Sequence, residues 1–492
     1  MKNGRLIRPA GAWRLLVAAL RCVATAGMVW AAVWAGAAPL PPAPQYRALW
    51  VDAFHEGFKT PSQTEALVRH ARRYNYNALM IEVRKAGDAY YASRHEPVAD
   101  DLAPGYDPLR HVISLCHGTG RGQPRLEVHA WMVVYRVGRD DAVTPKTHIL
   151  KRHPDWICRD QRGHTKEEKN LYLDPGVPGV IDYTAAIAQD IATQYDVDGI
   201  HLDYVRYPDA AWGYNPIAVK RFQQIQGARA TPAPGDAAWS QFRRDQITAL
   251  VRRVYAAIKT VKPLCRVSVA GIAYDAPQAD FSKSAPFVRV FQDWRGWLEE
   301  GIVDAVFVMN YKRELESAQR RDFRAWNAVA AKAAAGRHVV IGQAAYLQAP
   351  ALTITQLRDA LATPGVSGIA VYSYATPASR PADQPAFWEA ARARLFAAPA
   401  AIPRAAWLER PSTGALAGRV LRLKGSSTVP MDGVAVEVIG SVRRTLRADG
   451  GGYYLFFNLP PGAYTIRASG GASSAEVITG RVVRQDISVS AP

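Results

Sequence analysis

The chain has 492 residues, of which 49% are apolar and 10% aromatic, and its formal net charge at pH 7 is +18. This composition excludes global disorder and is typical of folded proteins, while the length suits one large domain and a smaller one. The positive charges are scattered and form no nucleic-acid motif, so we interpret them as a solvated basic surface that suits anionic polymers such as a cell wall.

The first 37 residues have the pattern of an export signal. Basic residues come first, an apolar run from Cys22 to Trp34 follows, and Ala35-Gly36-Ala37 resembles a cleavage site of small residues. We therefore expect a signal peptide over residues 1–37 and a periplasmic or secreted mature protein. An uncleaved signal anchor is the alternative, because Leu15 to Leu20 is also apolar, although Arg21 separates that stretch from the main run.

Three cysteines follow this segment: Cys116, Cys158 and Cys265. An odd number permits at most one internal disulfide and leaves a thiol. None has the close Cys or His spacing of a zinc site. We expect buried free thiols.

Strand-like and helix-like patterns alternate over residues 46–396. The apolar pattern of strands recurs eight times, at 47–52, 78–84, 126–135, 199–204, 266–273, 305–311, 338–344 and 368–374. Amphipathic stretches typical of helices lie between them, including 63–74, 183–195, 242–261, 322–335 and 354–362. Repeated βα units predict a parallel sheet, and eight of them favour a closed (β/α)8 TIM barrel of the α/β class over an open sheet.

The pattern changes after the barrel. Residues 397–414 are rich in Ala and Pro, which predicts a linker. Over residues 415–490, short strand patterns at 434–438, 453–457 and 464–467 are separated by Gly and Pro turns, which predicts a β-sandwich. The segments GRV (418–420), PMDGVAVEV (430–438) and ADGGGYYLFFNLPPGAYTI (448–466) resemble the carboxypeptidase regulatory-like (transthyretin-like) family. That resemblance implies a small accessory domain.

Polar side chains stand near the carboxyl ends of several predicted barrel strands. In GIHLDYVRYP (199–208), His201 and Asp203 share one side of the fourth strand. The carboxyl ends of barrel strands meet at one mouth, where chemistry is concentrated, so we expect this segment to enter a site. Each residue also has a structural alternative, such as a loop cap for Asp203 or an ion pair of Arg84 with Glu82 or Asp203.

The available groups narrow the chemistry. The chain lacks a glycine-rich phosphate loop and a G-x-S-x-G elbow, which argues against nucleotide chemistry and serine hydrolysis. Carboxylates among aromatic rings, Arg and Asn suit sugars, and glycoside hydrolysis needs a proton donor and a second carboxylate. We predict Asp203 as the ionised partner, because Arg84 or Arg206 would lower its pKa. Glu82 and Glu314 are the alternative proton donors.

Several segments resemble a known family. They are RALWVD (47–52), IEVRKAGDAYYAS (81–93), YDPL (106–109), LEVHAWMVVYR (126–136), DGIHLDYVRYP (198–208) and VDAVFVMNY (303–311), and they resemble glycosyl-hydrolase-like family 10, which is related to bacterial enzymes acting on peptidoglycan glycan strands. The resemblance spans residues 46–396. It implies a glycosidase-type barrel, export, polysaccharide hydrolysis and no organic cofactor. By position it highlights Arg47, Arg84, His129, Trp131, Asp203, Tyr207, Asn310 and Tyr311. Many relatives carry a second Asp where this chain has Tyr204.

The leading interpretation is an exported glycoside hydrolase that cleaves O-glycosidic bonds in peptidoglycan glycan or extracellular polysaccharide, with Asp203, Glu82 and Glu314 as catalytic candidates. The candidates for contact with the polysaccharide are Arg47, Arg84, His129, Trp131, His201, Tyr204, Arg206, Tyr207, Asn310 and Tyr311. A catalytically inactive polysaccharide-binding or wall-associated protein is the alternative. Metal-assisted removal of acetyl groups is a third, but His201 and Asp203 alone are too few ligands. We expect no metal, no cofactor and no nucleic-acid partner.

Overall fold

The computed structural model describes residues 42–139 and 144–490, together with Met1. The predicted signal peptide lies, apart from Met1, outside the described residues. Within the described part, no helix has both the length and the apolar character needed to cross a membrane.

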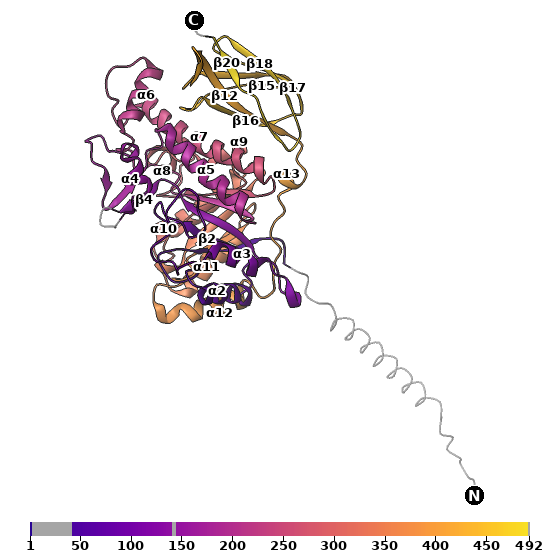
Figure 1. The fold of residues 1–492 in the computed structure, drawn as a ribbon. Helices are drawn as coiled ribbons and strands as arrows, with labels where there is room; N and C mark the ends of the chain where they lie inside the picture. Colours follow the sequence, from indigo (N-terminus) through magenta and orange to yellow (C-terminus); the bar gives the residue numbers. More distant parts are fainter. Residues whose placement is uncertain (2–41, 140–143, 491–492) are drawn as a thin grey trace. The chain divides into compact units, whose positions relative to one another are not determined.

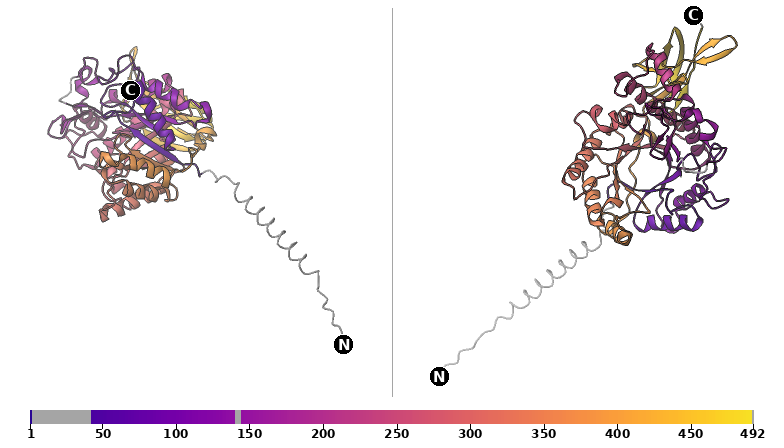
Figure 2. Two further views of the ribbon diagram at one scale, coloured as in Figure 1. Left: turned by 90° about the horizontal axis from the view of Figure 1, so that it is seen from below. Right: turned by 90° about the vertical axis from the view of Figure 1, so that its left-hand side faces the viewer.

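Eight parallel strands close into a barrel, so the predicted (β/α)8 fold is confirmed (Figures 1 and 2). The strands are β1 (Tyr46–Val51), β2 (Ala78–Arg84), β3 (Glu127–Val133), β7 (Gly199–Asp203), β8 (Arg266–Ile272), β9 (Ala305–Met309), β10 (His338–Ala344) and β11 (Gly368–Tyr372). The barrel is closed by β1 and β11, where Tyr46 pairs with Gly368. Figure 2 shows helices surrounding the ring of strands.

The longer helices are α2 (Pro61–Arg73), α3 (Pro108–His117), α5 (Pro178–Gln194), α6 (Pro216–Gln226), α7 (Ala237–Val261), α9 (Trp294–Glu300), α10 (Ser317–Lys332), α11 (Pro350–Leu361) and α12 (Gln384–Arg394). Those we predicted begin earlier than their apolar patterns, and in α2 and α7 a side-chain cap marks the start. Asp236 caps α7 by accepting a hydrogen bond of 2.7 Å from the Trp239 amide. Thr60 caps α2 in the same way through Gln63.

Two apolar layers hold the barrel. Inside the ring, Trp50, Met80 and Phe307 belong to one cluster, whereas Ile200 and Leu202 of β7 belong to the layer between strands and helices. Because side chains alternate along a strand, His201 and Asp203 lie on the side opposite Ile200 and Leu202. The interior is therefore packed at its centre, and a site must form at an end of the strands.

A small antiparallel sheet interrupts the βα alternation after β3. It consists of β4 (Arg136–Arg139), β5 (Lys166–Glu167) and β6 (Asn170–Tyr172). We predicted a single strand over 126–135 and nothing comparable to this excursion. The excursion follows the carboxyl end of β3, so it carries its first residue, Arg136, to the mouth of the barrel.

The C-terminal region is a β-sandwich of two sheets, which confirms the predicted class. One sheet contains β12 (Gly414–Lys424), β13 (Ser427–Pro430), β16 (Tyr453–Leu459), β19 (Val482–Arg484) and β20 (Ile487–Val489); the other contains β14 (Ala435–Ile439), β15 (Arg443–Arg447), β17 (Gly462–Ala468) and β18 (Gly471–Val477). Leu416 and Tyr454 of the first sheet cluster with Val436 and Ile466 of the second, so the two sheets share an apolar core.

The segment that we predicted as a linker is bound to the N-terminal end of the barrel. The Gln45 amide donates to the Ala401 carbonyl over 2.9 Å, and Arg47 Nη1 donates to the Ala398 carbonyl over 2.6 Å. Further along, a short helix α13 (Ala406–Glu409) carries Trp407, whose Nε1 donates to Asp304 Oδ1 over 2.8 Å. The connection therefore contributes to the barrel.

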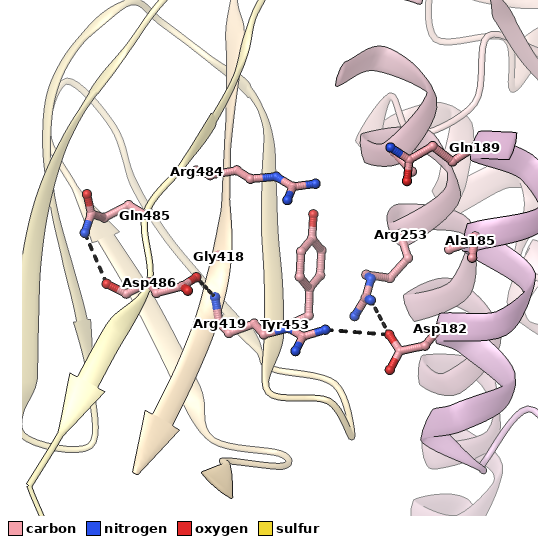
Figure 3. A pocket seen from close by; sticks show the side chains of 12 residues that line it. Asp182, Ala185, Gln189, Arg253, Gly418, Arg419, Tyr453, Arg484, Gln485 and Asp486 are labelled. Atoms are coloured by element: carbon pink, nitrogen blue, oxygen red, sulfur yellow. Dashed lines mark hydrogen bonds and ion pairs between the residues drawn. The ribbon is translucent and has the colours of Figure 1, made fainter. Parts of the chain in front are cut away.

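The β-sandwich packs against α5 and α7. Arg253 of α7 bonds Asp182 of α5 and lies 4.2 Å from the ring centroid of Tyr453, while Arg419 of β12 lies 3.8 Å from the same Asp182 (Figure 3). A cavity of about 500 Å³ lies among these side chains. It is polar and lies on the helical exterior of the barrel, away from the strand ends.

The three cysteines are free and buried, as predicted. Burial raises the pKa of the Cys116 and Cys265 thiols to about 12, and raises that of Cys158 as well. These thiols are apolar packing groups at neutral pH.

Candidate active site

A cavity of about 340 Å³ opens at the carboxyl ends of the barrel strands. The predicted site residues that line it are Glu82, Trp131, Asp203, Tyr204, Arg206 and Tyr311. They come from β2, β3, β7 and the segments that follow β7 and β9, so separate strands supply one cavity. The cavity beside Arg253 is larger, but it lacks this convergence of strand ends; size alone does not identify the site.

Glu82 is a buried carboxyl with one backbone hydrogen bond. Its Oε2 accepts from the Ala53 amide over 2.6 Å, and its Oε1 has no hydrogen-bond partner in the described part of the chain. Burial raises the pKa of Glu82 from 4.5 to about 8, against the opposing effects of the Ala53 amide and Arg136. The group is therefore mainly protonated at pH 7 and has a proton to give.

Asp203 is the last residue of β7, and its carboxyl accepts a hydrogen bond from the main chain of the next residue. Oδ1 accepts from the Tyr204 amide over 2.6 Å, and Tyr204 adopts the left-handed region with φ of 52°. Burial raises the pKa of Asp203, opposed by Arg206, the Tyr204 amide and Arg136. Arg206 does lower this pKa, as expected, but desolvation outweighs the nearby positive charge, so the expectation of a low pKa for Asp203 is wrong.

Arg84 pairs with a different acid. Its Nε lies 2.9 Å from both carboxylate oxygens of Glu96, and both side chains are fully buried. Its Nη1 also donates to the carbonyl oxygens of Val133 and Val134. The guanidinium thus fixes the ends of β2 and β3, and neither Glu82 nor Asp203 forms an ion pair with it.

Two arginines contact the Tyr204 ring. The guanidinium carbon of Arg136 lies 4.6 Å from the ring centroid and that of Arg206 lies 4.3 Å from it. Arg136 also lies 5.3 Å from the Phe54 ring centroid. We call Arg136, Tyr204 and Arg206 the arginine–tyrosine stack; all three line the cavity.

Aromatic rings form much of the remaining wall. Tyr311 and Tyr372 stack with centroids 5.9 Å apart at 28°, and Tyr346 meets Tyr372 edge-on at 6.0 Å. Trp131 and Trp50 also line the cavity, and the Trp131 side chain lies close enough to Asp203 to lower the pKa of that carboxyl. Such rings suit the apolar faces of sugars, and polar atoms suit their hydroxyls.

Sequence reasoning missed several lining residues. They are Trp50, Phe54, Arg136, Tyr274, Lys312, Tyr346 and Tyr372. Trp50 and Tyr372 lie at the ends of β1 and β11, where the rule that led us to Asp203 applies equally. Nothing in the sequence indicated that Arg136 lies at the mouth, because the small sheet of β4 to β6 was not predicted.

His201 lies deeper inside the barrel than Asp203 and does not line the cavity. Its Nε2 accepts from Trp50 Nε1 over 3.1 Å, and its Nδ1 lies 2.9 Å from Ser268 Oγ. Burial lowers the pKa of His201 to about 3, so the ring is neutral. It positions the Trp50 indole from below.

Two further candidates lie toward the N-terminal end of the barrel. Arg47 donates to main-chain carbonyls and lies 4.6 Å from the Phe396 ring centroid. His129 lies 3.0 Å from Glu127, which also bonds Arg266. The structure does not bring either residue to the cavity.

Three candidates near the mouth lie behind its wall. The Tyr207 hydroxyl lies 3.4 Å from Asp174, and Asn310 Nδ2 bonds the Phe323 carbonyl and Asn327. Glu314 lies 3.4 Å from Arg324 and is absent from the lining. Of the two proton-donor candidates, only Glu82 lines the same cavity as Asp203.

The described residues contain no group of three or more His, Cys, Asp and Glu side chains close enough to hold a metal ion. The cavity offers carboxyl groups, guanidinium groups and aromatic rings instead. These groups can move protons and bind hydroxyls.

A closed barrel with two carboxyl groups and aromatic walls at its mouth is the arrangement of glycosidase-type barrels. The model of the Glycosyl hydrolase-like 10 family matches residues 45–356, and the chain belongs to this family. Similar proteins include "Glycosyl hydrolase YngK" of Bacillus subtilis, 26% identical over 61% of this chain and 61% of that protein. "Glycosyl hydrolase DigH" of Escherichia coli K12 is 28% identical over 51% of this chain and 58% of its own length.

The chain therefore spans about three-fifths of the length of these relatives. Among solved structures, the PgaB (BpsB) glycoside hydrolase domain from Bordetella bronchiseptica is similar with a TM-score of 0.50 and 16% identity. The similarity covers 70% of this chain and 98% of that domain, which supports the fold.

Proposed function

We propose that the protein is an exported glycoside hydrolase that cleaves O-glycosidic bonds in a bacterial polysaccharide, with Glu82 as the proton donor and Asp203 as the second carboxylate. The observation that carries the proposal is the presence of both carboxyl groups in one aromatic-walled cavity at the barrel mouth. The raised pKa of Glu82 supports its role as the acid.

In the proposed reaction, Glu82 protonates the glycosidic oxygen as its bond to the sugar breaks. The ionised Asp203 stabilises the positive charge on the sugar ring. It then either takes a proton from the water that adds to the anomeric carbon, or adds to that carbon itself and is released by water, whose proton returns to Glu82. Arg206 and Arg136 favour the ionised form of Asp203, although burial opposes it. The aromatic walls hold the ring, so its orientation is fixed before the bond breaks.

We propose the glycan strands of peptidoglycan, or an extracellular polysaccharide, as the substrate. The basic composition suits an anionic wall, and the N-terminal pattern suits export to the periplasm or beyond. We also propose that the C-terminal sandwich is a carboxypeptidase regulatory-like module, on the strength of its sequence segments.

The test is the release of reducing ends from purified glycans, including peptidoglycan strands stripped of peptides. We expect hydrolysis by the wild-type protein and a loss of about a thousandfold or more in Asp203→Asn, because the second carboxylate can no longer ionise. Circular dichroism and the melting temperature serve as the folding control. Equal activity in the variant would refute the assignment of Asp203.

A catalytically inactive polysaccharide-binding protein is the second candidate. Tyr204 favours it, because relatives often place an acid there and this chain places an aromatic ring. Saturable binding of the glycan by the wild-type protein with no reducing ends released from any glycan tested would support this candidate against the first.

A further inference from the structure

Arg206 is a buried cation that forms no direct ion pair; Asp203 acts on it only at longer range. Arg206 is 8% exposed. Within the described part of the chain, its guanidinium forms no ion pair within 4 Å and no hydrogen bond, and its Nε is buried. Buried guanidinium groups are ordinarily paired, because removing a charge from water is costly. The face of Tyr204 offsets only a fraction of that cost.

Arg136 also contacts the Tyr204 ring. It is half-buried, and the described residues give it ring contacts with Phe54 and Tyr204 but no ion pair or hydrogen bond. The two guanidinium groups come from different segments, the excursion after β3 and the loop after β7. The stack therefore fixes two unpaired cations in one wall of the cavity.

The charges that line the cavity do not cancel. Arg136, Arg206 and Lys312 face Asp203 and Glu82, and Glu82 keeps its proton at neutral pH. Lys312 Nζ donates to the Ala273 carbonyl over 2.7 Å, and burial lowers its pKa. Even with Lys312 left aside, two guanidinium groups exceed one ionised carboxylate.

A second cavity of about 430 Å³ continues from this wall, since Tyr204, Arg206, Tyr274 and Lys312 line both. It also contains Arg289 and the acids Glu167, Glu168 and Asp275. Glu167 accepts from Asn170 and from the Tyr172 hydroxyl, so it has partners of its own. Arg206 thus stands between two adjoining spaces, each large enough for a part of a glycan chain.

We propose that the arginine–tyrosine stack binds a carboxylate carried by a sugar of the substrate, so that the enzyme selects acidic glycans. The inference rests on the proposed function and names the substrate class. A planar guanidinium offers paired N–H donors that match the two oxygens of a carboxylate, and a partly desolvated site strengthens the contact. The carboxylate belongs either to the lactyl ether of a peptide-free wall glycan or to a uronic acid.

The experiment measures binding by calorimetry to Asp203→Asn, which serves as a non-hydrolysing background. The probes are peptide-free peptidoglycan oligosaccharides, uronic-acid oligosaccharides, and each of these after chemical reduction of its carboxyl groups to alcohols. We expect at least one acidic probe to bind about tenfold or more tightly than its reduced form. The tighter of the two acidic probes identifies the source of the carboxylate.

Adding Arg206→Gln to that background should bring the ratio between acidic and reduced probes close to one. Arg320→Gln is the matched control, because it removes the same charge from an exposed position on α10 and should preserve the ratio. Arg136→Gln provides a second variant if Arg206→Gln does not fold. Equal binding of acidic and reduced probes, or a ratio that survives both stack variants, would overturn the inference.

The binding ratio is independent of turnover. If the wild-type protein binds acidic probes selectively but releases no reducing ends, the hydrolase proposal fails and the carboxylate site stands. If it hydrolyses acidic and carboxyl-reduced glycans with equal kcat/KM and binds them equally, the hydrolase proposal stands and the carboxylate site fails.

Discussion

In the described part of the chain, several charged residues at the N-terminal end of the barrel are paired with each other, whereas those that line the cavity at the C-terminal end are not. At the N-terminal end, Asp304 bonds Lys259 over 2.8 Å, and Glu127 bonds Arg266 and His129. At the C-terminal mouth, Glu82 has a single backbone donor, and Arg206 has no ion pair in the described residues. Charged groups that are paired with each other have a structural role, whereas unpaired charged groups in a cavity are candidates for contact with a ligand.

This contrast explains why strand position alone selected too many residues. His129 and His201 share the inward side of their strands with Trp131 and Asp203, but each histidine is already hydrogen-bonded inside the barrel. The distinction lies in what surrounds a side chain. It becomes visible only once the partners are known.

The largest effect that would test the contrast is expected at Glu82. Replacing it with Gln in Glu82→Gln removes the proposed proton donor, so we expect kcat on a natural glycan to fall by about 10² to 10⁴-fold. An aryl glycoside with a good leaving group needs less protonation, so its hydrolysis should fall less. Initial rates on both substrates measure the difference.

Glu314→Gln is the matched control, because Glu314 lies outside the cavity beside Arg324. It should keep nearly full activity. A large loss in Glu314→Gln with little loss in Glu82→Gln would reverse the assignment of the donor.

Replacing a paired charged residue at the N-terminal end should lower the stability of the fold without changing kcat. Lys259→Met leaves the fully buried Asp304 carboxylate without its ammonium partner, and we expect unfolding to become easier by about 3–5 kcal/mol. Urea denaturation measures this change, and kcat per folded molecule should stay constant. Lys262→Met, which breaks an exposed pair with Asp196, should cost no more than about 1 kcal/mol.

Similar losses of stability in the two lysine variants would argue against a special role for burial at Asp304. If Lys259→Met had a lower kcat under conditions in which it is fully folded, the N-terminal end of the barrel would contribute to catalysis as well as to stability.

A change in the pH dependence of stability is expected at Glu82. The pKa is about 8 in the folded protein and about 4.5 in the unfolded chain, so the unfolded carboxyl ionises first as pH rises. Glu82 therefore costs stability progressively between pH 4.5 and 8 and by a constant amount above that range. Relative to wild type, Glu82→Gln should gain up to about 5 kcal/mol between pH 4.5 and 8, because each pKa unit of difference corresponds to about 1.4 kcal/mol.

Denaturation of both proteins at several pH values checks this prediction. A gain that shrinks as pH rises would mean that the folded-state pKa of Glu82 is not raised.

The barrel could be predicted from the sequence because its strands are buried on both sides and read as continuous apolar runs. The range 78–84 matches β2, and 338–344 matches β10. The excursion at β4–β6 could not be predicted, since its strands are two to four residues long and have no apolar pattern. Most strands of the sandwich are similarly short or exposed.

The site was predictable in part. Strand position led to Asp203, Glu82, Trp131, Tyr204, Arg206 and Tyr311, which line the candidate cavity. The partners of the arginines were not predictable. Arg84 pairs with Glu96 from the following loop and not with Glu82 or Asp203, and Arg136 contacts Tyr204 from a separate segment. Such pairings depend on the path of the connecting chain.

The polypeptide that follows the last barrel helix defines the smallest useful fragment. Ala398 and Ala401 supply carbonyl oxygens to Arg47 and Gln45, and Trp407 reaches Asp304. A fragment cut at residue 396 would remove the Ala398 carbonyl from the Arg47 guanidinium and the Trp407 donor from Asp304. Expression of the barrel without its sandwich should therefore extend through Glu409, well beyond the end of the family match.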